Sequence, residues 1–253
     1  MLNRTEKKQR NYYNKISKRY DSFHNLKPNL DYRFNLYNRF LKNIILENES
    51  EVLDAMCGGG QNSFYFDKMY PNANVTGIDI SEEQIIAYGK RFPKYQAVIG
   101  SITDTGFKDN FFDLVVIESL HHLHPHVNDG IKEIDRILKP EGYLFIWEPN
   151  SSSFIDYFRK FWYKNDPVFF ESNERSIDSK RIETKLQSTY AIILKEYGGS
   201  FGYIFTIGSM YLRIPKILLR IISPMAIAIE NSLTFLHSKI LSCWFALLLK
   251  KRN

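Results

Sequence analysis

Residues 52–60 read Val-Leu-Asp-Ala-Met-Cys-Gly-Gly-Gly, and residues 75–80 read Val-Thr-Gly-Ile-Asp-Ile. The first stretch predicts a buried parallel strand that runs into a glycine turn, because strands covered on both faces are short apolar runs. The second predicts a neighbouring strand that ends in Asp79. Glycines let the backbone approach a ligand closely, and an acid at the end of the next strand is placed to bind ribose hydroxyls. Together the two stretches indicate a site for a small molecule that contains a nucleoside.

Two cofactor classes share this arrangement, and the spacing of the glycines separates them. The dinucleotide fingerprint requires G-x-G-x-x-G, but here the glycines are consecutive and Ser63 stands where the last glycine should be. The stretch instead resembles motif I of the class I S-adenosylmethionine-dependent methyltransferases, a strand and an acid followed by G-x-G-x-G. Gly58 and Gly60 match that motif, and Met56 occupies the place of its first glycine.

Motifs further along the chain resemble the same family. Residues 111–118, Phe-Phe-Asp-Leu-Val-Val-Ile-Glu, predict a fourth strand, residues 131–140 an amphipathic helix, and residues 143–149 another buried strand. Their order and spacing are similar to the family's post-I and C-terminal motifs. The resemblance implies an α/β fold, a Rossmann-like doubly wound and mostly parallel sheet. An N-terminal helical cap, an aromatic insertion and C-terminal hydrophobic helices are expected around it.

The chain divides into three predicted regions. Residues 1–47 carry two helical patterns, and the first resembles the cofactor-capping helix of ubiquinone/menaquinone-type methyltransferases, with Tyr20-Asp21 at the matching place. Residues 48–210 hold the methyltransferase domain, and residues 150–180 form within it an aromatic lid or substrate-binding insertion. A helix near residues 181–196 and a strand at residues 200–207 are expected to complete the sheet.

Residues 211–253 are predicted to form a hydrophobic helical tail. Charged residues interrupt its apolar blocks, so a membrane span is not expected. We expect an amphipathic anchor in the plane of a membrane, and the alternative is that the helices pack on the domain or on a second subunit. The predicted apolar face consists of Leu233, Leu236, Ile240, Trp244, Leu247 and Leu248.

Composition favours a folded protein with anionic partners. The chain has 253 residues, 44% of them hydrophobic, and a net charge of +6. It has two cysteines, Cys57 and Cys243, too few for a disulfide framework, and no secretory pattern at its N-terminus. We therefore expect a cytoplasmic protein, with peripheral attachment to the inner face of the membrane as an extension of that prediction.

The resemblance also implies which residues bind the cofactor, S-adenosyl-L-methionine. Asp79 binds the ribose, and Asp54 orients the loop and the methionine ammonium, unless it is only a buried loop-orienting acid. The adenine amino group meets Ser101, Asp104 after a shift, or mainly the backbone of Ile102. The complete predicted set is Asp54, Ala55, Cys57, Gly58, Gly60, Asp79, Ile80, Ser101, Ile102 and Glu118.

Three residues at or just after the tip of the fourth predicted strand are candidates for catalysis. Glu118 is expected to face the place where the methyl group and the acceptor meet. It holds the methionine amino group or the acceptor, and the alternative is that it is a solvated loop acid. His121 or His122 is a candidate general base for a hydroxyl acceptor, because imidazole titrates near neutrality. No metal is expected, although His124 and His126 follow closely.

The leading prediction is a methyltransferase that acts on a small-molecule or lipid-linked acceptor at the membrane surface. A nucleic-acid acceptor is disfavoured, because the N-P-P-Y type motif of amino-directed methylases is absent from the sequence. The alternatives are a non-catalytic relative that binds the cofactor or a partner enzyme, and a nicotinamide-dependent reductase. The reductase is disfavoured because no tyrosine is followed four residues later by lysine.

Overall fold

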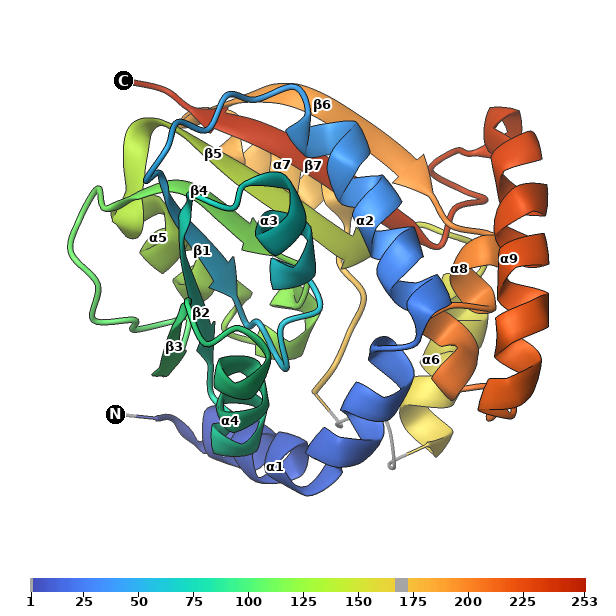
Figure 1. The fold of residues 1–253 in the computed structure, drawn as a ribbon. Helices are drawn as coiled ribbons and strands as arrows, with labels where there is room; N and C mark the ends of the chain where they lie inside the picture. The colour runs from blue at the N-terminus through green and yellow to red at the C-terminus, as the bar shows by residue number, and fades with distance from the viewer. Residues whose placement is uncertain (1, 167–172) are drawn as a thin grey trace.

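The computed structural model describes residues 2–166 and 173–253, so Phe169 and Phe170 of the predicted insertion lie outside the described residues. Strands and helices alternate through the first part of the chain (Figure 1). The strands are β1 (Glu51–Ala55), β2 (Asn74–Asp79), β3 (Gln96–Ile99), β4 (Phe112–Ile117), β5 (Leu138–Pro149), β6 (Tyr190–Gly198) and β7 (Trp244–Lys251). The α-helices are α1 (Arg4–His24), α2 (Lys27–Leu41), α3 (Ser63–Met69), α4 (Glu82–Arg91), α5 (Val127–Ile137), α6 (Asp156–Asn165), α7 (Ser179–Leu186), α8 (Phe201–Ile204) and α9 (Lys216–Ser232). Three 3₁₀ turns are η1 (Leu120–Leu123), η2 (Ile207–Met210) and η3 (Thr234–Leu236).

The strands form one seven-stranded sheet in the order β3-β2-β1-β4-β5-β7-β6. Strands β1 to β5 pair in parallel, and β7 runs antiparallel to both of its neighbours, β5 and β6. The order reverses at β1, where β2 and β4 lie on either side, and open α/β sheets bind ligands at such a point. The predicted Rossmann-like, mostly parallel sheet is confirmed.

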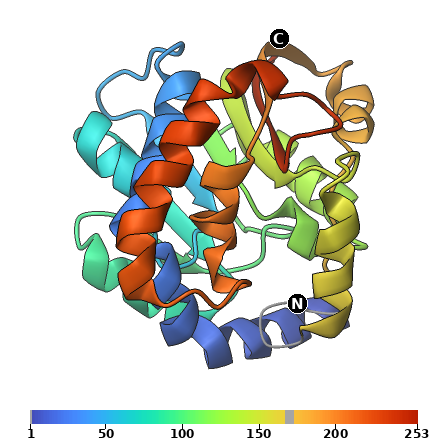
Figure 2. The same cartoon turned by 90° about the vertical axis from the view of Figure 1, so that its right-hand side faces the viewer.

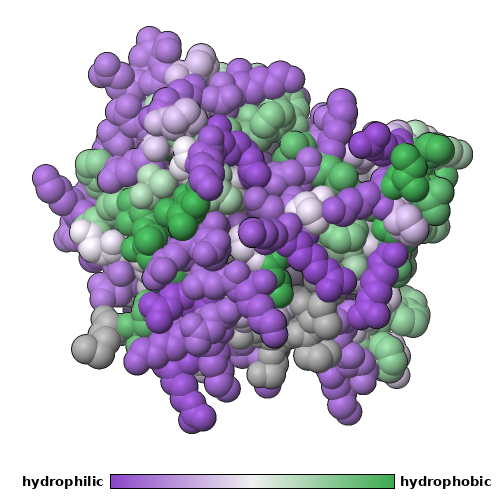
Figure 3. Space-filling model, turned by 60° about the horizontal axis from the view of Figure 1, so that its bottom comes forward, coloured by the Kyte–Doolittle hydropathy of each residue, from purple (hydrophilic) through white to green (hydrophobic). Residues whose placement is uncertain are grey.

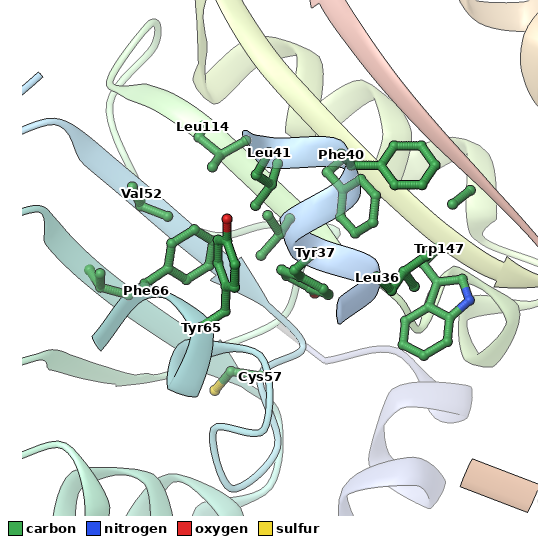
Figure 4. Packing of buried hydrophobic residues seen from close by; sticks show 14 of the residues in the cluster. Leu36, Tyr37, Phe40, Leu41, Val52, Cys57, Tyr65, Phe66, Leu114 and Trp147 are labelled. Atoms are coloured by element: carbon green, nitrogen blue, oxygen red, sulfur yellow. The ribbon is translucent and has the colours of Figure 1, made fainter. Parts of the chain in front are cut away.

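Side-chain alternation along the strands builds a core on each face of the sheet. Val52 points into the cluster formed with α2, α3 and α4, while Leu53 points into the cluster formed with α5 and α7. On the first face, Tyr37 and Phe40 of α2 pack against Phe145 of β5 with ring centroids 4.9 and 5.1 Å apart (Figure 4). Both faces are therefore covered, which is why the strands read as nearly continuous apolar runs.

Helix α1 lies across the carboxyl ends of the parallel strands, along the bottom of the molecule in Figure 1. Helices α6 and α9 both lie on the side that faces the viewer in Figure 2, where α8 lies between them. None of the helices within residues 2–166 and 173–253 combines the length and the apolar composition that crossing a bilayer takes.

The prediction of a helical tail is wrong for its last part. Residues Trp244–Lys251 form β7, and Trp244 is 1% exposed and donates from Nε1 to the Tyr32 hydroxyl at 3.0 Å. Leu247 and Leu248 pair with strands on both sides, so neither is on a helical surface. A strand between two others, covered on both faces, is apolar at every position and resembles a helical apolar block.

The elements expected just before the tail are also different. Residues 200–207, predicted as a strand, contain helix α8, and the strand that closes the sheet is β6, which takes up much of the helix predicted near residues 181–196. Buried and exposed side chains do not alternate regularly along β6, and its pairing with β7 shifts register between Ile192 and Leu194. An edge strand of this kind lacks the clean period of two that identifies a strand from sequence.

Candidate functional site

The glycine turn after β1 and the acid at the end of β2 meet directly. The Asp79 carboxylate accepts hydrogen bonds from the backbone N–H of Gly58 at 2.9 Å and of Ser81 at 2.8 Å. The Cys57 N–H donates to the Ile78 carbonyl at 3.0 Å, which fastens the turn to the neighbouring strand. The two stretches that the sequence singled out therefore form one site at the switch point of the sheet.

A small crevice of about 50 Å³ opens at this site. Of the predicted cofactor-binding residues, it is lined by Gly58, Asp79, Ile80, Ser101 and Ile102. These residues fit S-adenosylmethionine: a backbone turn for the methionine part, a carboxylate for the ribose, and the turn after β3 for the adenine. When bound, this group supplies a methyl group on a positively charged sulfur.

The remaining motif residues lie behind the turn. Asp54 is fully buried, and its carboxylate accepts from Ser63 Oγ at 2.7 Å and Asn62 Nδ2 at 3.2 Å. Burial raises the pKa of Asp54 to about 7, and these hydrogen bonds only partly oppose the shift. Asp54 is therefore placed to hold the loop, and its contact with the methionine ammonium stays a prediction.

Ala55, Cys57 and Gly60 also shape the turn from behind. Ala55 and Cys57 are buried, and burial raises the pKa of the Cys57 thiol well above its ordinary value. Gly60 has φ +91°, and a Cβ there would lie 2.5 Å from the Phe92 ring. Met56, at the place of the family's first glycine, also takes a left-handed conformation with φ +56° and lines the crevice. The turn thus keeps its shape without that glycine.

Helix α1 fills much of the crevice from the open side. Glu6, Gln9 and Tyr13 line it, and Gln9 Nε2 donates to the His122 carbonyl. Ligand pockets are typically about 300 Å³ or larger. Side chains of α1 therefore have to move outward to admit a cofactor. Asp21, in the predicted Tyr20-Asp21 pair, accepts from Gln61 Nε2 at 3.0 Å and so attaches α1 to the glycine turn.

A second cavity of about 320 Å³ adjoins the crevice. Four residues line both spaces: Tyr13, Tyr20, Ser119 and His122. Aromatic side chains form most of the apolar wall, namely Trp147, Phe158, Trp162, Tyr163, Tyr203 and Tyr211. The residues predicted for catalysis, Glu118, His121 and His122, all line this second cavity.

Each of the two histidines is held by a buried carboxyl group. His121 Nδ1 lies 2.8 Å from Glu148 Oε2, and His122 Nδ1 lies 3.0 Å from Glu174 Oε1 and 3.0 Å from the Tyr13 hydroxyl. Burial lowers the pKa of His121 and raises the pKa of Glu148 well away from their ordinary values. The His121–Glu148 pair therefore favours its uncharged form, and protonation of the His121 ring is disfavoured.

Glu118 is paired with a buried cation. Its carboxylate contacts Arg33 Nη1 of α2, and the same Arg33 nitrogen donates to Asn62 Oδ1 at 3.2 Å. The Arg33 guanidinium also lies 5.3 Å from the centre of the Trp147 ring. Glu118 is thus fixed in the wall between the glycine loop and the second cavity, so it is not a solvated loop acid.

One group of side chains could hold a metal ion. Within the described part of the chain, donor atoms of His121, His122 and Glu174 lie within 4.8 Å of one another. His124 and His126 are not in this group. The expectation that the site uses no metal stays a prediction.

Several residues of the two cavities were not identified from the sequence. Glu6 matched a helix-start pattern, since it completes a capping box with Asn3, and that pattern concealed its place in the crevice. Glu148 and Glu174 reach the histidines from β5 and from the segment after α6. Tertiary structure alone brings them there, although an acid at the end of the strand β5 was a usable signal for Glu148.

A sheet of this order, with a nucleoside-type crevice at its switch point, defines the class I methyltransferase fold. Residues 53–146 match a family model described as "Methyltransferase domain". This match covers the part of the chain that holds the glycine turn and Asp79, and it confirms the predicted resemblance to S-adenosylmethionine-dependent methyltransferases and the predicted cofactor.

Comparison with individual proteins agrees with this assignment. Phthiotriol/phenolphthiotriol dimycocerosates methyltransferase 1 of Mycobacterium ulcerans is 30% identical over 130 residues, which are 51% of this chain and 47% of that protein. Demethylmenaquinone methyltransferase of Chlorobaculum tepidum is 29% identical over 143 residues, 55% of this chain and 59% of that protein. The matches span about half the length of these relatives. A SAM dependent methyltransferase from Archaeoglobus fulgidus has a similar fold, with a TM-score of 0.62 and 17% identity over 91% of this chain and 97% of that one.

Proposed function

We propose that this protein transfers a methyl group from S-adenosylmethionine to an apolar small-molecule or lipid-linked acceptor. The observation that carries the proposal is the aromatic cavity of about 320 Å³ that adjoins the cofactor crevice. His122 lines both spaces, so an acceptor in the cavity and a methyl donor in the crevice would meet beside its ring. Such proximity supplies most of what methyl transfer needs from a protein.

The cavity wall favours a large apolar acceptor with a protic group. Its aromatic side chains offer apolar contact area, and its polar side chains include His121, His122, the buried Arg33 and the partly buried Arg159. The two named relatives are a phthiotriol/phenolphthiotriol dimycocerosates methyltransferase and a demethylmenaquinone methyltransferase, which supports an acceptor of lipid or quinone type.

In the proposed mechanism, His122 removes the proton from the acceptor. A hydrogen bond from Nδ1 to Glu174 would leave Nε2 of the ring as the proton acceptor. Glu174 then stabilises the imidazolium that forms, and Tyr13 holds the ring in place. His121, supported by Glu148, is the alternative base in the same wall.

A membrane surface is the proposed place of action. Exposed apolar side chains follow one another at helical spacing along α9, at Ile217, Ile221, Met225 and Ile229. Lys216 and Arg220 on the same helix are exposed, whereas its single acid, Glu230, is buried. An apolar face with basic neighbours suits an anionic lipid surface.

Helix α6 adds exposed aromatic side chains beside the acceptor cavity, on the same side of the molecule as α9 (Figure 2). Phe154, Tyr157 and Phe161 are exposed, while Phe158 and Trp162 of the same segment line the cavity. Figure 3, in which the bottom of the molecule comes forward, shows hydrophobic side chains at the right edge and a second hydrophobic group left of centre, on an otherwise mostly hydrophilic surface. A lipid acceptor would thus reach the cavity from the bilayer without crossing water.

The test is methyl transfer from labelled S-adenosylmethionine into a lipid extract. Wild-type protein is expected to label an extractable lipid or quinone. His122→Ala should lower kcat by about 100-fold or more, because it removes the proposed base, and should change the affinity for S-adenosylhomocysteine by a much smaller factor. Glu174→Gln should lower kcat as well, by a smaller factor.

His237→Ala is the matched control, since His237 lies after η3, away from both cavities, and should keep wild-type turnover. Wild-type turnover in His122→Ala would exclude that base, and the same result in His121→Ala would exclude base catalysis by either histidine. If no lipid or quinone is labelled by wild-type protein, the proposed acceptor class is wrong.

A further inference from the structure

The first turn of α1 places a carboxylate at the end of the cofactor crevice. Glu6 is 5% exposed and lines the crevice together with Ser101 and Ile102. Glu6 Oε1 accepts hydrogen bonds from the Ser101 hydroxyl and, at 2.6 Å, from the Thr103 hydroxyl. Glu6 Oε2 accepts from the Asn3 backbone N–H at 2.8 Å. The carboxylate is thus held over the turn that follows β3.

This turn is where the adenine ring is expected, because the ribose would lie one strand away on Asp79. The exocyclic amine of adenine is a hydrogen-bond donor and needs an acceptor. The resemblance assigns that role to an acid at position 101, where this chain has serine. Among the described residues that line the crevice, Glu6 and Asp79 are the two acids.

We propose that Glu6 is the residue that recognises adenine, so that α1 supplies the carboxylate missing from the turn after β3. The proposal rests on the proposed use of S-adenosylmethionine. Ser101 and Thr103 are then positioning residues, because their hydroxyls hold the Glu6 carboxylate and do not meet the base themselves.

The chemistry of Glu6 suits this role. Burial alone would raise the pKa of Glu6, but the hydrogen bonds from Ser101, Thr103 and Asn3 outweigh it and lower that pKa below its ordinary value. The group is therefore an ionised acceptor at neutral pH. A carboxylate has room for about four hydrogen bonds and here receives three, which leaves a position for the adenine amine.

The arrangement also links recognition of the cofactor to the acceptor cavity. Glu6 is on the same helix as Tyr13 and Tyr20, which line both spaces. An adenine ring held by Glu6 would fix α1 in the position that closes both the cofactor crevice and the acceptor cavity. Loss of the Glu6 carboxylate should therefore reduce the preference for adenine over other purine bases, and should not abolish binding of the ribose and methionine parts of the cofactor.

The experiment compares S-adenosylhomocysteine with S-inosylhomocysteine by calorimetric titration of the full chain. The inosyl compound has a carbonyl oxygen in place of the adenine amine. That oxygen and the Glu6 carboxylate are both hydrogen-bond acceptors, so they cannot form a hydrogen bond with each other. Wild-type protein is expected to prefer the adenosyl compound by about 10 to 100-fold, the size of a hydrogen bond to a charged group. Glu6→Gln should abolish that preference, mainly by weakening the adenosyl compound about tenfold.

Glu6→Gln is the suitable variant, because glutamine can still complete the capping box with Asn3 and preserve the helix start. Glu83→Gln is the control: it makes the same charge change at an exposed glutamate near the crevice, and should keep the wild-type preference. Asp79→Asn should weaken both compounds by similar factors, since it acts on the ribose.

Three outcomes would overturn the inference. An unchanged preference in Glu6→Gln would show that another group reads the base. Tighter binding of S-adenosylhomocysteine by Glu6→Gln would show that Glu6 only obstructs the crevice. If wild-type protein binds neither compound, the proposed function fails together with the inference. In the first two outcomes wild-type protein binds S-adenosylhomocysteine, so only the inference fails.

Discussion

Asp54 has a carboxyl group that is fully buried, and its two hydrogen bonds do not compensate for that burial. Its pKa is raised from an ordinary 3.8 to about 7, so the folded protein keeps a proton that the unfolded chain releases. Such a group contributes stability that is complete below pH 4 and is lost as the pH rises through about 7. The residue that matches the family's motif therefore holds the loop at a cost near neutral pH.

Asp54→Asn should remove this pH dependence. The amide is uncharged, and it can donate to Ser63 Oγ, whose hydroxyl can then turn toward Tyr88. Measured by urea unfolding, the variant should equal wild type near pH 4 and exceed it by about 4 kcal/mol at pH 8. Parallel stability curves between pH 4 and 8 would show that the Asp54 carboxyl ionises normally in the fold.

Residues in local motifs could be predicted, and residues brought in by tertiary structure could not. Gly58 and Asp79 follow strands whose ends are visible in the sequence, so their meeting follows from the parallel sheet. Glu6 and Glu174 are far from that motif along the chain. Nothing in their own neighbourhood of sequence distinguishes them from a helix cap or a surface acid.

Local sequence patterns also identify the strands in the first half of the sheet, but not those in the second half. Strands β1, β2 and β4 have turn residues at their ends and helices between them, and the sequence predicts each of them. Strand β7 lies between β5 and β6 and is reached through a long crossover, so its apolar run has no local mark of a strand. The membrane hypothesis accordingly depends on α9 and α6 and no longer on residues 244–251.

Helix α9 offers a direct test of membrane attachment. Ile221 and Met225 are 65% and 63% exposed, so replacing both by glutamate should leave the fold intact. Wild-type protein should float with vesicles that contain phosphatidylglycerol, and the double variant should lose roughly 100-fold in partitioning, because two apolar side chains no longer enter the lipid.

Ile86→Glu is the control for this test. Ile86 is 50% exposed on α4, a helix remote from α9 (Figure 1), and its replacement should not change flotation. Wild-type protein that stays at the bottom of the gradient, with every vesicle composition, would contradict the proposed attachment.

The whole molecule is organised around a helix that closes two spaces at once. Helix α1 covers the cofactor crevice with Glu6 and Gln9 and reaches the acceptor cavity with Tyr13 and Tyr20. It is fastened to the glycine turn by Asp21, which Arg91 of α4 also contacts at 3.2 Å. Opening of α1 is therefore the expected step that admits the cofactor, and under the proposed function its closure would bring the histidines, the acceptor and the methyl donor together.

The most direct test is a crystal structure of the protein grown with S-adenosylhomocysteine. We predict that the ligand lies in the crevice at the carboxyl ends of β1 and β2, with its ribose hydroxyls on Asp79 and its sulfur toward His122. Glu6 should keep its hydrogen bonds from Ser101 and Thr103 and accept a further one from the adenine amine. A crevice still filled by Glu6 and Gln9, with the ligand elsewhere or absent, would contradict the assignment of this site.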